Sequence, residues 1–301
     1  MRIISFCNLF CYYYINYWSN IFISCGKSIA NILANLSKYF KCAFYGIKGN
    51  DQEGEISLKS LEEMKIETNI RTINEETKTR FINGNNFSNI CPYCKKKYGY
   101  DGNKMSLNDL EGYIEENDYF VIDNLDEFTI NVLNKYHNEA FLNLEEIDDI
   151  ETFGFKELSD ILKKRFNIIC LNEGVYYYLK DKFLVDSYDL YDSFEPKILI
   201  INRSLRGCDI IYDNNFIKKT IEEKIKYVDL NGIGDAFFSE FVRTFIEEKE
   251  TTEKMISKAF IRALTSISVC AKYLGARGHL IKPYKIKTYN KCICKDIVID
   301  K

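Results

Sequence analysis

Short apolar runs alternate with helical patterns along most of this chain of 301 residues. Several of the runs are almost continuously apolar, which is typical of strands buried on both faces of a sheet. Helices with apolar residues three and four apart are predicted at 28–39, 58–65, 233–248 and 252–273, and strands at 42–46, 119–122, 140–144, 167–171, 197–201 and 208–212. This order predicts an α/β fold whose mostly parallel sheet is flanked by helices and binds its ligand at the carboxyl ends of the strands.

The composition excludes several classes of protein. A hydrophobic content of 46% in 301 residues can build a sizeable core, which excludes a disordered chain. The formal charge of -3 gives neither nucleic acid nor an anionic membrane an electrostatic footprint. The 11 cysteines are irregularly spaced and follow no signal peptide, so we expect a protein of the reducing cytoplasm.

The first 26 residues leave two alternatives open. Residues 3–26 carry no charge and are long enough for a membrane span, but Asn8, Asn16, Asn20 and four tyrosines interrupt the apolar pattern. We expect a pair of buried strands and no contact with a membrane. Further along, residues 67–87 are polar, extended and rich in turn residues, which favours a flap over a core element. Residues 91–104 are expected to form an exposed loop.

The richest chemistry lies in residues 226–238. The sequence predicts a strand at 225–228, a tight turn at 231–234 and a helix from Ala236, so the turn amides would point out of a helix N-terminus, where anions bind. Gly232 and Gly234 would let a phosphate approach the backbone, and Asp235 could take a proton from an attacking hydroxyl. In the alternative interpretation, Asp235 is an ordinary favourable charge near a helix N-terminus. The residues alone leave both open.

Five landmarks in order resemble the ribokinase/PfkB carbohydrate kinase family. Residues 229–235, Asp-Leu-Asn-Gly-Ile-Gly-Asp, are similar to its Asp-Thr-x-Gly-Ala-Gly-Asp signature. The other four are Gly26-Lys-Ser-Ile-Ala-Asn31, the glycine-rich turn 46–54, the loop Ile201-Asn-Arg-Ser-Leu-Arg-Gly207, and Gly275-Ala276. The resemblance implies one ribokinase-like domain over residues 1–301, a three-layer sandwich whose small β lid comes from about 67–87 and part of 1–24.

The resemblance also implies roles for individual residues. Asp235 would be the catalytic base, and the amides of Gly232, Ile233 and Gly234 the anion hole. Gly26, Asn31 and Asp51 would bind the acceptor; Asn172, Arg203, Ser204 and Gly207 would bind the nucleotide; Asp229 would help hold a monovalent cation such as K⁺; and Glu173 would belong to the water network around Mg²⁺. Lids of this family often pair between subunits, which makes a homodimer an open expectation.

Some positions depart from the family pattern. Leu230 replaces the threonine of the signature, Lys27 its second early glycine, and Asn202 and Ser204 replace residues of the nucleotide loop. The family's Asn-x-x-Glu ends here in Val175, and Glu173 is the neighbouring substitute. No acidic residue precedes Asp51, so the strand that brings a substrate-binding aspartate in the family is missing from the pattern.

The cysteine pairs offer a weaker alternative. Cys91 and Cys94 have the spacing of a redox pair or of half a zinc site, but Cys292 and Cys294, the other close pair, are separated by one residue. We expect loop cysteines without a metal.

Taken together, the sequence and the resemblance predict a cytoplasmic, ATP- and Mg²⁺-dependent kinase. It would move the γ-phosphoryl group to a primary alcohol of a sugar or small polyol. The alternative is a catalytically degenerate member that binds a nucleotide or metabolite as a sensor. A membrane-tethered or zinc-holding interaction protein is a third hypothesis, resting on residues 3–26 and the Cys91 pair.

Overall fold

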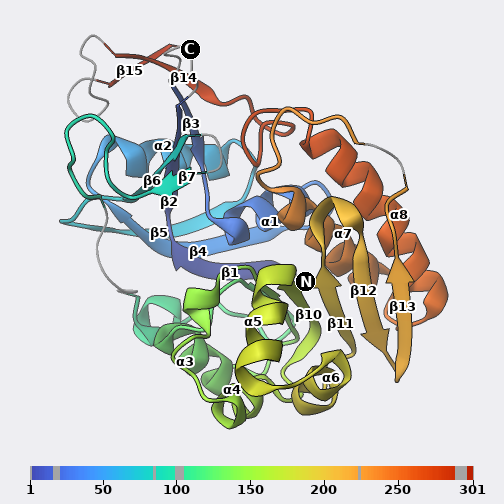
Figure 1. Ribbon diagram of the computed structural model, residues 1–301. Coiled ribbons are helices and arrows are strands. Elements are labelled where there is room, and N and C mark those ends of the chain that lie inside the picture. Colours follow the sequence, from blue (N-terminus) through green and yellow to red (C-terminus); the bar gives the residue numbers. More distant parts are fainter. Residues whose placement is uncertain are drawn as a thin grey trace.

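The computed structural model describes residues 2–15, 21–83, 86–98, 105–222, 225–288 and 297–300. In this part, nine strands form a central sheet in the order β13-β12-β11-β10-β9-β8-β1-β4-β5 (Figure 1). The parallel strands are β1 (Ile3–Asn8), β4 (Cys42–Gly49), β5 (Glu67–Ile73), β8 (Tyr119–Ile122), β9 (Ala140–Leu144), β10 (Phe166–Asn172) and β11 (Ile198–Asn202). β12 (Cys208–Tyr212) and β13 (Asn215–Lys219) run antiparallel at one edge.

Helices cover both faces of this sheet because its inner strands are apolar on both faces. Ile3 packs into one core and Ile4 into the other, as the alternation of side chains along a strand requires. On the first face lie α1 (Ser28–Leu36), α7 (Ile233–Glu248) and α8 (Glu253–Cys270). On the second lie α3 (Glu127–Lys135), α4 (Phe155–Leu162), α5 (Glu173–Phe183) and α6 (Ser187–Phe194). The predicted three-layer α/β sandwich is confirmed (Figure 1).

A second, smaller sheet lies beside the first. Among the described residues its order is β15-β14-β3-β2-β6-β7, formed by β2 (Phe10–Ile15), β3 (Ile21–Cys25), β6 (Lys78–Asn83), β7 (Asn86–Ser88), β14 (Tyr284–Thr288) and β15 (Ile297–Asp300). The helix α2 (Gln52–Glu62) packs against β2 and β3. The chain's C-terminal strands therefore extend a sheet that is otherwise built from the first ninety residues (Figure 1).

Three details differ from the sequence expectations. Residues 67–73 are β5, an edge strand of the central sheet. Of the predicted lid, β6, β7, β2 and β3 belong to the second sheet, and the C-terminal strands β14 and β15, which were not predicted for it, extend that sheet. The N-terminal stretch makes three strands, and β1 does enter the central sheet although it brings no acid. The strand predicted at 225–228 is not formed, and this segment lies outside the sheet. Val228 is 68% exposed, and its amide donates to the carbonyl of Ala271.

The helix expected at 58–65 begins earlier, at Gln52. Asp51 precedes it, and its carboxylate accepts a hydrogen bond from the amide of Gly54. This N-cap starts the helix inside a stretch whose glycines and charges hide the helical period.

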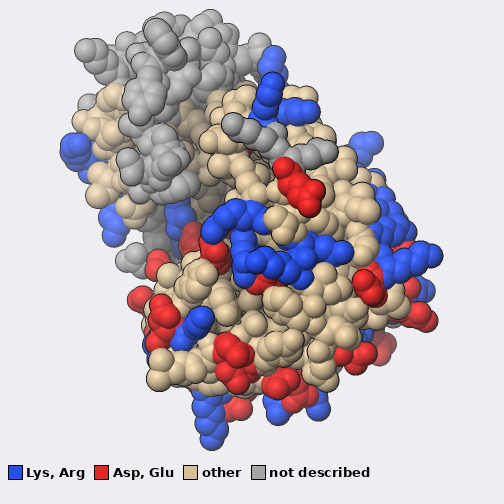
Figure 2. All heavy atoms as spheres, turned by 45° about the vertical axis from the view of Figure 1, so that its right-hand side comes forward, with Lys and Arg blue, Asp and Glu red and all other residues tan. Residues whose placement is uncertain are grey.

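Two observations bear on the surface. No helix within the described residues is long and apolar enough to cross a membrane. Basic and acidic side chains are interspersed over the face shown in Figure 2.

Candidate active site

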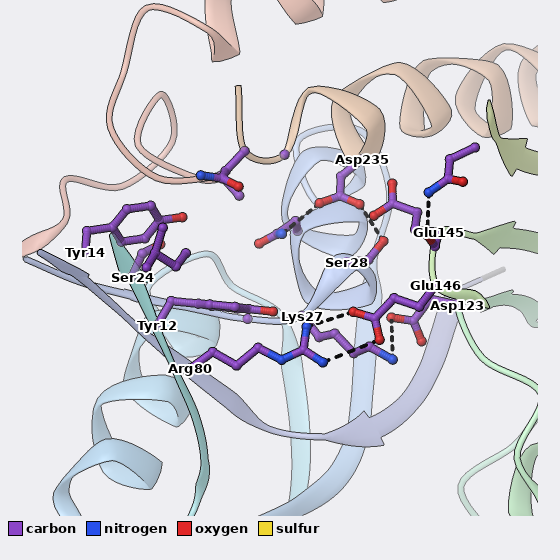
Figure 3. A pocket seen from close by; sticks show the side chains of 17 residues that line it. Tyr12, Tyr14, Ser24, Lys27, Ser28, Arg80, Asp123, Glu145, Glu146 and Asp235 are labelled. Carbon is purple, nitrogen blue, oxygen red and sulfur yellow. Dashed lines mark hydrogen bonds and ion pairs between the residues drawn. The ribbon is translucent and has the colours of Figure 1, made fainter. Parts of the chain in front are cut away.

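The polar residues of the candidate site gather where parallel strands end. Asp123 follows β8, Glu145 and Glu146 follow β9, and the first turns of α1 and α7 point to the same place. Together with residues of the small sheet they enclose a cavity of about 440 Å³ (Figure 3). Its lining consists of Tyr12, Tyr14, Ser24, Gly26, Lys27, Ser28, Asn31, Arg80, Ile82, Asp123, Glu145, Glu146, Asn172, Asn231, Gly232, Asp235 and Ala276. The carboxyl ends of the strands thus hold the site, as the fold class predicts.

Asp235 stands in the first turn of α7 and is buried, with 4% of its surface exposed. Ser28 Oγ donates to its Oδ1 at 2.5 Å, and Asn31 Nδ2 donates to its Oδ2 at 2.8 Å. Burial raises the pKa of Asp235 to about 6, although these two hydrogen bonds favour its charged form. Its carboxylate is therefore fixed in direction and has a basicity suited to accepting a proton near neutral pH.

The turn before α7 is shaped by glycine. Gly232 has φ of 82°, and a Cβ there would lie 2.4 Å from the Cβ of Ala276. Asp229 braces the turn: its Oδ1 accepts from the amide of Asn231 at 3.0 Å, and its Oδ2 from the amide of Gly275 at 2.8 Å. The brace holds the predicted anion-hole residues, Gly232, Ile233 and Gly234, at the start of the helix.

Two buried acceptor atoms of residues that line the cavity lack hydrogen-bond partners in the described part of the chain. They are Oδ1 of Asn31 and Oδ1 of Asp123. The other oxygen of Asp123 accepts from the amide of Ile29 at 3.1 Å and lies 4.0 Å from Lys27 Nζ. A buried oxygen without a donor is costly, so these two atoms are suited to accept hydrogen bonds from a ligand.

The small sheet covers the cavity from the other side. Tyr12, Tyr14 and Ser24 line it from β2 and β3, and Arg80 reaches in from β6 (Figure 3). Arg80 binds Glu146 through both guanidinium nitrogens, at 2.8 and 3.4 Å. This ion pair joins the small sheet to the end of β9.

Glu145 lies at the junction between this cavity and the next. Its side chain accepts from Asn143 Nδ2 at 3.2 Å, and a Cβ on Gly234 would lie 2.7 Å from its Oε1. The enclosing protein and the charge of Asp235 raise the pKa of Glu145 to about 8. The carboxyl is therefore mostly neutral near pH 7, which makes it compatible with an anion at the neighbouring turn.

The second cavity, of about 380 Å³, lies on the other side of the turn. Its lining includes Asn172, Glu173, Asn202, Arg203 and Ser204, and it shares Glu145, Asn172, Asn231 and Gly232 with the first. Asn172 caps α5 by accepting from the amide of Val175 at 2.7 Å. Arg203 pairs with Asp209, and Glu173 pairs with Arg206.

Most of the residues predicted for the site come together. Gly26, Asn31 and Asp235 line the first cavity, and Asn172, Arg203 and Ser204 the second. Gly207 lines neither, but its φ of 102° favours glycine, and a Cβ there would clash with the backbone of Lys219.

Asp51 is the predicted acceptor residue that the structure places elsewhere. Besides capping α2, its carboxylate accepts from the amide of Thr77 at 2.6 Å and from the Thr77 hydroxyl at 2.5 Å. These bonds fasten the chain between β5 and β6, and Asp51 is not part of the cavity lining.

The cysteine alternative gains no support from the described residues. Cys91 is buried and Cys94 exposed, and no group of three metal-binding side chains occurs in the described ranges. Cys292 and Cys294 lie outside those ranges.

The motif comparison missed several residues of the first cavity: Ser28, Arg80, Asp123, Glu145 and Glu146. Three of them, the acids, directly follow strands that the sequence did predict. Their position at the carboxyl ends of parallel strands is a signal that could have identified them. Arg80 gave no such signal, because its contact depends on how the small sheet folds over the central one.

Comparisons with known proteins identify the fold. The sequence matches no protein-family model and no curated protein sequence. Among solved structures, a fructokinase from Xylella fastidiosa with bound ATP aligns with a TM-score of 0.76 at 14% identity, covering 92% of this chain and 94% of that one. An aminoimidazole riboside kinase from Salmonella enterica aligns with a TM-score of 0.74 at 14% identity, covering 93% and 97%. A ribokinase from Thermotoga maritima aligns with a TM-score of 0.67 at 14% identity, covering 93% and 96%. The likeness spans nearly the whole of each chain, and the fold is that of the ribokinase-like sugar kinases.

Proposed function

We propose that this chain, which has the ribokinase-like fold, is an ATP-dependent phosphotransferase that moves the γ-phosphoryl group to a primary alcohol of a sugar or related polyol. One observation carries the proposal. The turn at Gly232–Gly234 separates two cavities that share part of their lining, and Asp235 faces the first of them. An acceptor in one cavity and a nucleotide in the other would meet at the amides of a helix N-terminus.

In this proposal Asp235 removes the proton of the acceptor hydroxyl. Ser28 and Asn31, which hydrogen-bond its two oxygens, keep the carboxylate in position before the acceptor arrives. The amides of Gly232, Ile233 and Gly234 take up charge on the transferring phosphoryl group, helped by the dipole of α7. Positioning and electrostatics then supply most of the rate enhancement, as is general for phosphoryl transfer.

The acceptor hydroxyls would bind the two buried oxygens without partners, Oδ1 of Asn31 and Oδ1 of Asp123. Asp123 would thus supply the acid that the sequence lacks before Asp51. Tyr12 and Tyr14 would cover the sugar and exclude water, so the small sheet would act as the lid. A polyol with neighbouring hydroxyls matches this set of acceptors.

ATP would occupy the second cavity, with Arg203 and Ser204 beside its phosphates or base. Because a neutral Glu145 lies beside Gly234, it would not repel an anion at the turn, which fits a phosphate group. Mg²⁺, carried by ATP, would neutralise charge on the phosphoryl group. Val175 supplies no carboxylate for its water shell, and Glu173, the proposed substitute, is already paired with Arg206.

A monovalent cation such as K⁺ would bind near Asp229. Asp229 joins the two loops that carry the carbonyl oxygens of Asn231 and Ala276, and both of these oxygens lie around Cys270 Sγ, at 3.8 and 3.6 Å. This oxygen-rich set fits an alkali cation, whose role would be to stiffen the turn behind the anion hole.

The test uses purified protein, ATP with Mg²⁺, and a panel of sugars, polyols and nucleosides, with ADP release as the measurement. The parent should turn over at least one acceptor. Asp235→Asn should keep ATP affinity while phosphoryl transfer falls by about 10² to 10⁴. Unchanged turnover in this variant would refute the role of Asp235. Nucleotide binding without turnover of any acceptor would refute the enzyme and favour the sensor.

A further inference from the structure

Cys11 and Cys25 face each other across the two strands that flank the acceptor cavity. They are paired residues in the antiparallel register of β2 and β3, and both are buried, with 0% and 3% of their surfaces exposed. The amide of Gly26 donates to the carbonyl of Phe10 at 2.9 Å, so the neighbouring pair 10/26 is the hydrogen-bonded one. Hydrogen-bonded and non-hydrogen-bonded pairs alternate, and Cys11 and Cys25 therefore form a non-hydrogen-bonded pair.

This register brings two thiols within bonding range. Residues of a non-hydrogen-bonded antiparallel pair have Cα atoms about 4.5 Å apart, inside the range that disulfides span. Because the two residues lie directly opposite each other in the register, their side chains leave the same face of the sheet. We propose that Cys11 and Cys25 are a redox pair that closes to a disulfide when a small hydroperoxide oxidises the folded chain.

The surroundings favour Cys25 as the thiol that reacts first. Burial opposes the ionisation of both thiols, but the guanidinium of Arg277, which lies beside Gly26, favours the thiolate of Cys25 and lowers its pKa. Burial and the neighbouring thiol raise the pKa of Cys11 well above its ordinary value. Cys25 is therefore the better nucleophile, and Cys11 the thiol that resolves the intermediate.

The reaction balances with hydrogen peroxide alone. The Cys25 thiolate attacks one peroxide oxygen, the O–O bond breaks, and a sulfenic acid and hydroxide form. Cys11 then attacks the sulfenic sulfur, the S–O bond breaks, and the leaving hydroxide takes the Cys11 proton to become water. Two thiols and one hydrogen peroxide thus give one disulfide and two molecules of water. Because both thiols are buried, an oxidant of about the size of water is required.

The bond would act on the acceptor side of the molecule. Tyr12 and Ser24 follow and precede the two cysteines and line the cavity from the opposite face of the same strands. Cys25 also directly precedes Gly26, where the chain enters α1. A disulfide would fix the spacing of β2 and β3 beside the cavity. The pair itself requires no kinase activity, so this inference stands independently of the proposed function.

The experiment treats the full chain with hydrogen peroxide, then blocks remaining thiols, digests and maps the linked peptides. The expected product joins the peptides of Cys11 and Cys25, loses two hydrogen atoms in mass, and is reversed by dithiothreitol. The melting temperature should rise by about 5 °C, because the bond closes a loop in the unfolded chain. Cys11→Ala should lose both effects. Cys170→Ala should keep them, since Cys170 is buried in β10 without a cysteine paired across from it.

The peptide map of the parent decides the matter even where a variant folds poorly. A Cys11 thiol that remains free after complete oxidation of exposed Cys94 would overturn the proposal, as would Cys25 recovered as sulfinic acid.

Discussion

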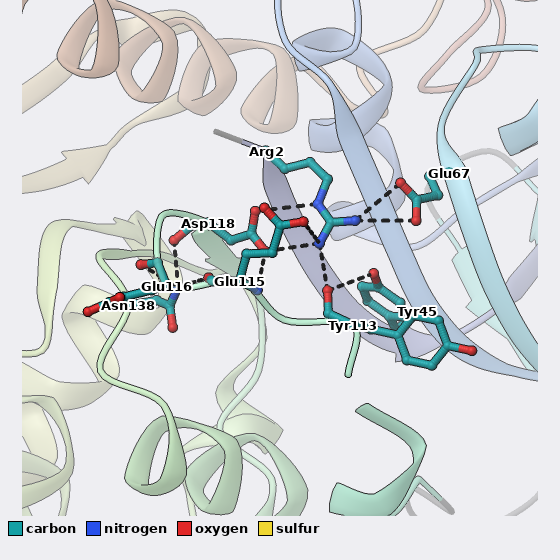
Figure 4. A network of polar contacts seen from close by, with 8 residues as sticks. All are labelled: Arg2, Tyr45, Glu67, Tyr113, Glu115, Glu116, Asp118 and Asn138. Atoms are coloured by element: carbon teal, nitrogen blue, oxygen red, sulfur yellow. Dashed lines mark hydrogen bonds and ion pairs between the residues drawn. The ribbon is translucent and has the colours of Figure 1, made fainter. Parts of the chain in front are cut away.

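The two ends of the parallel strands are built on opposite electrostatic plans. At the amino ends, Arg2 immediately precedes β1. It bonds to Glu67, the first residue of β5, and to Asp118, which immediately precedes β8 (Figure 4). At the carboxyl ends, Asp123, Glu145, Glu146 and Asp235 gather around one cavity. At the first end the guanidinium of Arg2 is bound on all sides by acceptors. At the second end four carboxyls share two cations, Lys27 and Arg80, and two buried oxygens lack partners in the described part of the chain.

The amino-end network is saturated. The Arg2 guanidinium donates to Asp118 Oδ2 at 3.0 Å, to Glu67 Oε2 at 3.2 Å and to the carbonyl of Tyr113 at 2.5 Å. Asn138 donates from one amide group to the carbonyls of Glu115 and Asp118, at 2.9 and 2.8 Å. These bonds tie three parallel strands together where no ligand is expected.

The two ends differ in their effect on the stability of the fold: the hydrogen bonds of the amino end stabilise it, and the buried carboxyls of the carboxyl end lower its stability. Burial raises the pKa of Asp123 and of Asp235, so the folded chain holds these carboxyls in a state that water would stabilise better. Such strain is typical of a functional site. The saturated network at the opposite end of the same strands helps the sheet to tolerate it.

Removing the cation at the amino end should give the largest effect. Arg2→Met leaves the fully buried carboxylate of Asp118 without its ion partner, and the free energy of unfolding should fall by about 3–5 kcal/mol. Urea unfolding measures this loss. Arg2→Met with Asp118→Asn should recover more than half of it, and turnover per folded molecule should stay unchanged. A loss below about 1 kcal/mol would show that the network stabilises little.

At the carboxyl ends of the strands, the contribution of Asp235 to the free energy of unfolding should depend on pH. The pKa of Asp235 rises from 3.8 to about 6 on folding, so between these values the folded chain binds more protons than the unfolded chain. Its contribution to stability is therefore lost as pH rises from about 4 to about 6. Relative to the parent, Asp235→Asn should gain on the order of 2–3 kcal/mol over this window. Urea unfolding of both proteins at pH 4 and pH 7 checks it, and equal differences at the two pH values would contradict the raised pKa.

The sequence predicted most strands of the central sheet well because each of them is a short, nearly continuous apolar run. The runs 119–122, 140–144 and 208–212 match β8, β9 and β12, since continuous apolar residues have no stable place outside a two-sided sheet. Residues 225–228 include three apolar or aromatic residues, but they lie outside the sheet, with Tyr227 and Val228 exposed. Residues 67–73 are polar because β5 is an edge strand, and the sequence could not distinguish that from a flap.

The motif comparison identified only the part of the site around the turn before α7. The motif at residues 229–235, with its two glycines at a tight turn, identifies Gly232, Gly234 and Asp235. Asp123 and Arg80 lie far from that motif. The contacts of Asp123 with Lys27 and of Arg80 with Glu146 depend on strand order, which no local pattern encodes. Asp51 is the opposite case: it matches the family motif in sequence, but in the structure its carboxylate caps α2.

A moderate effect on acceptor binding is expected when Asp123, one of whose oxygens lacks a hydrogen-bond partner among the described residues, loses its charge. Asp123→Asn keeps one oxygen for the amide of Ile29 but weakens the hydrogen bond offered to an acceptor hydroxyl. The KM for the acceptor should rise by about 10- to 100-fold, as for the loss of a charge-assisted hydrogen bond. The KM for ATP serves as the internal control and should not change. An equal rise in both would place Asp123 in the general stability of the site.

The smallest effect concerns Glu145, whose carboxyl faces the anion-binding turn. The pKa of Glu145 is raised to about 8, so it becomes ionised above that pH and then repels the phosphoryl group at Gly234. The parent should lose about tenfold in kcat/KM for ATP between pH 7 and pH 9, because about nine tenths of Glu145 is ionised at pH 9. Glu145→Gln should abolish this basic limb and retain the acidic limb of Asp235 near pH 6, since a protonated Glu145 is already neutral when Asp235 ionises. Profiles of kcat/KM against pH for both proteins decide the assignment. A basic limb that survives in Glu145→Gln belongs to another group, and a lost acidic limb would mean that Glu145, and not Asp235, accepts the proton.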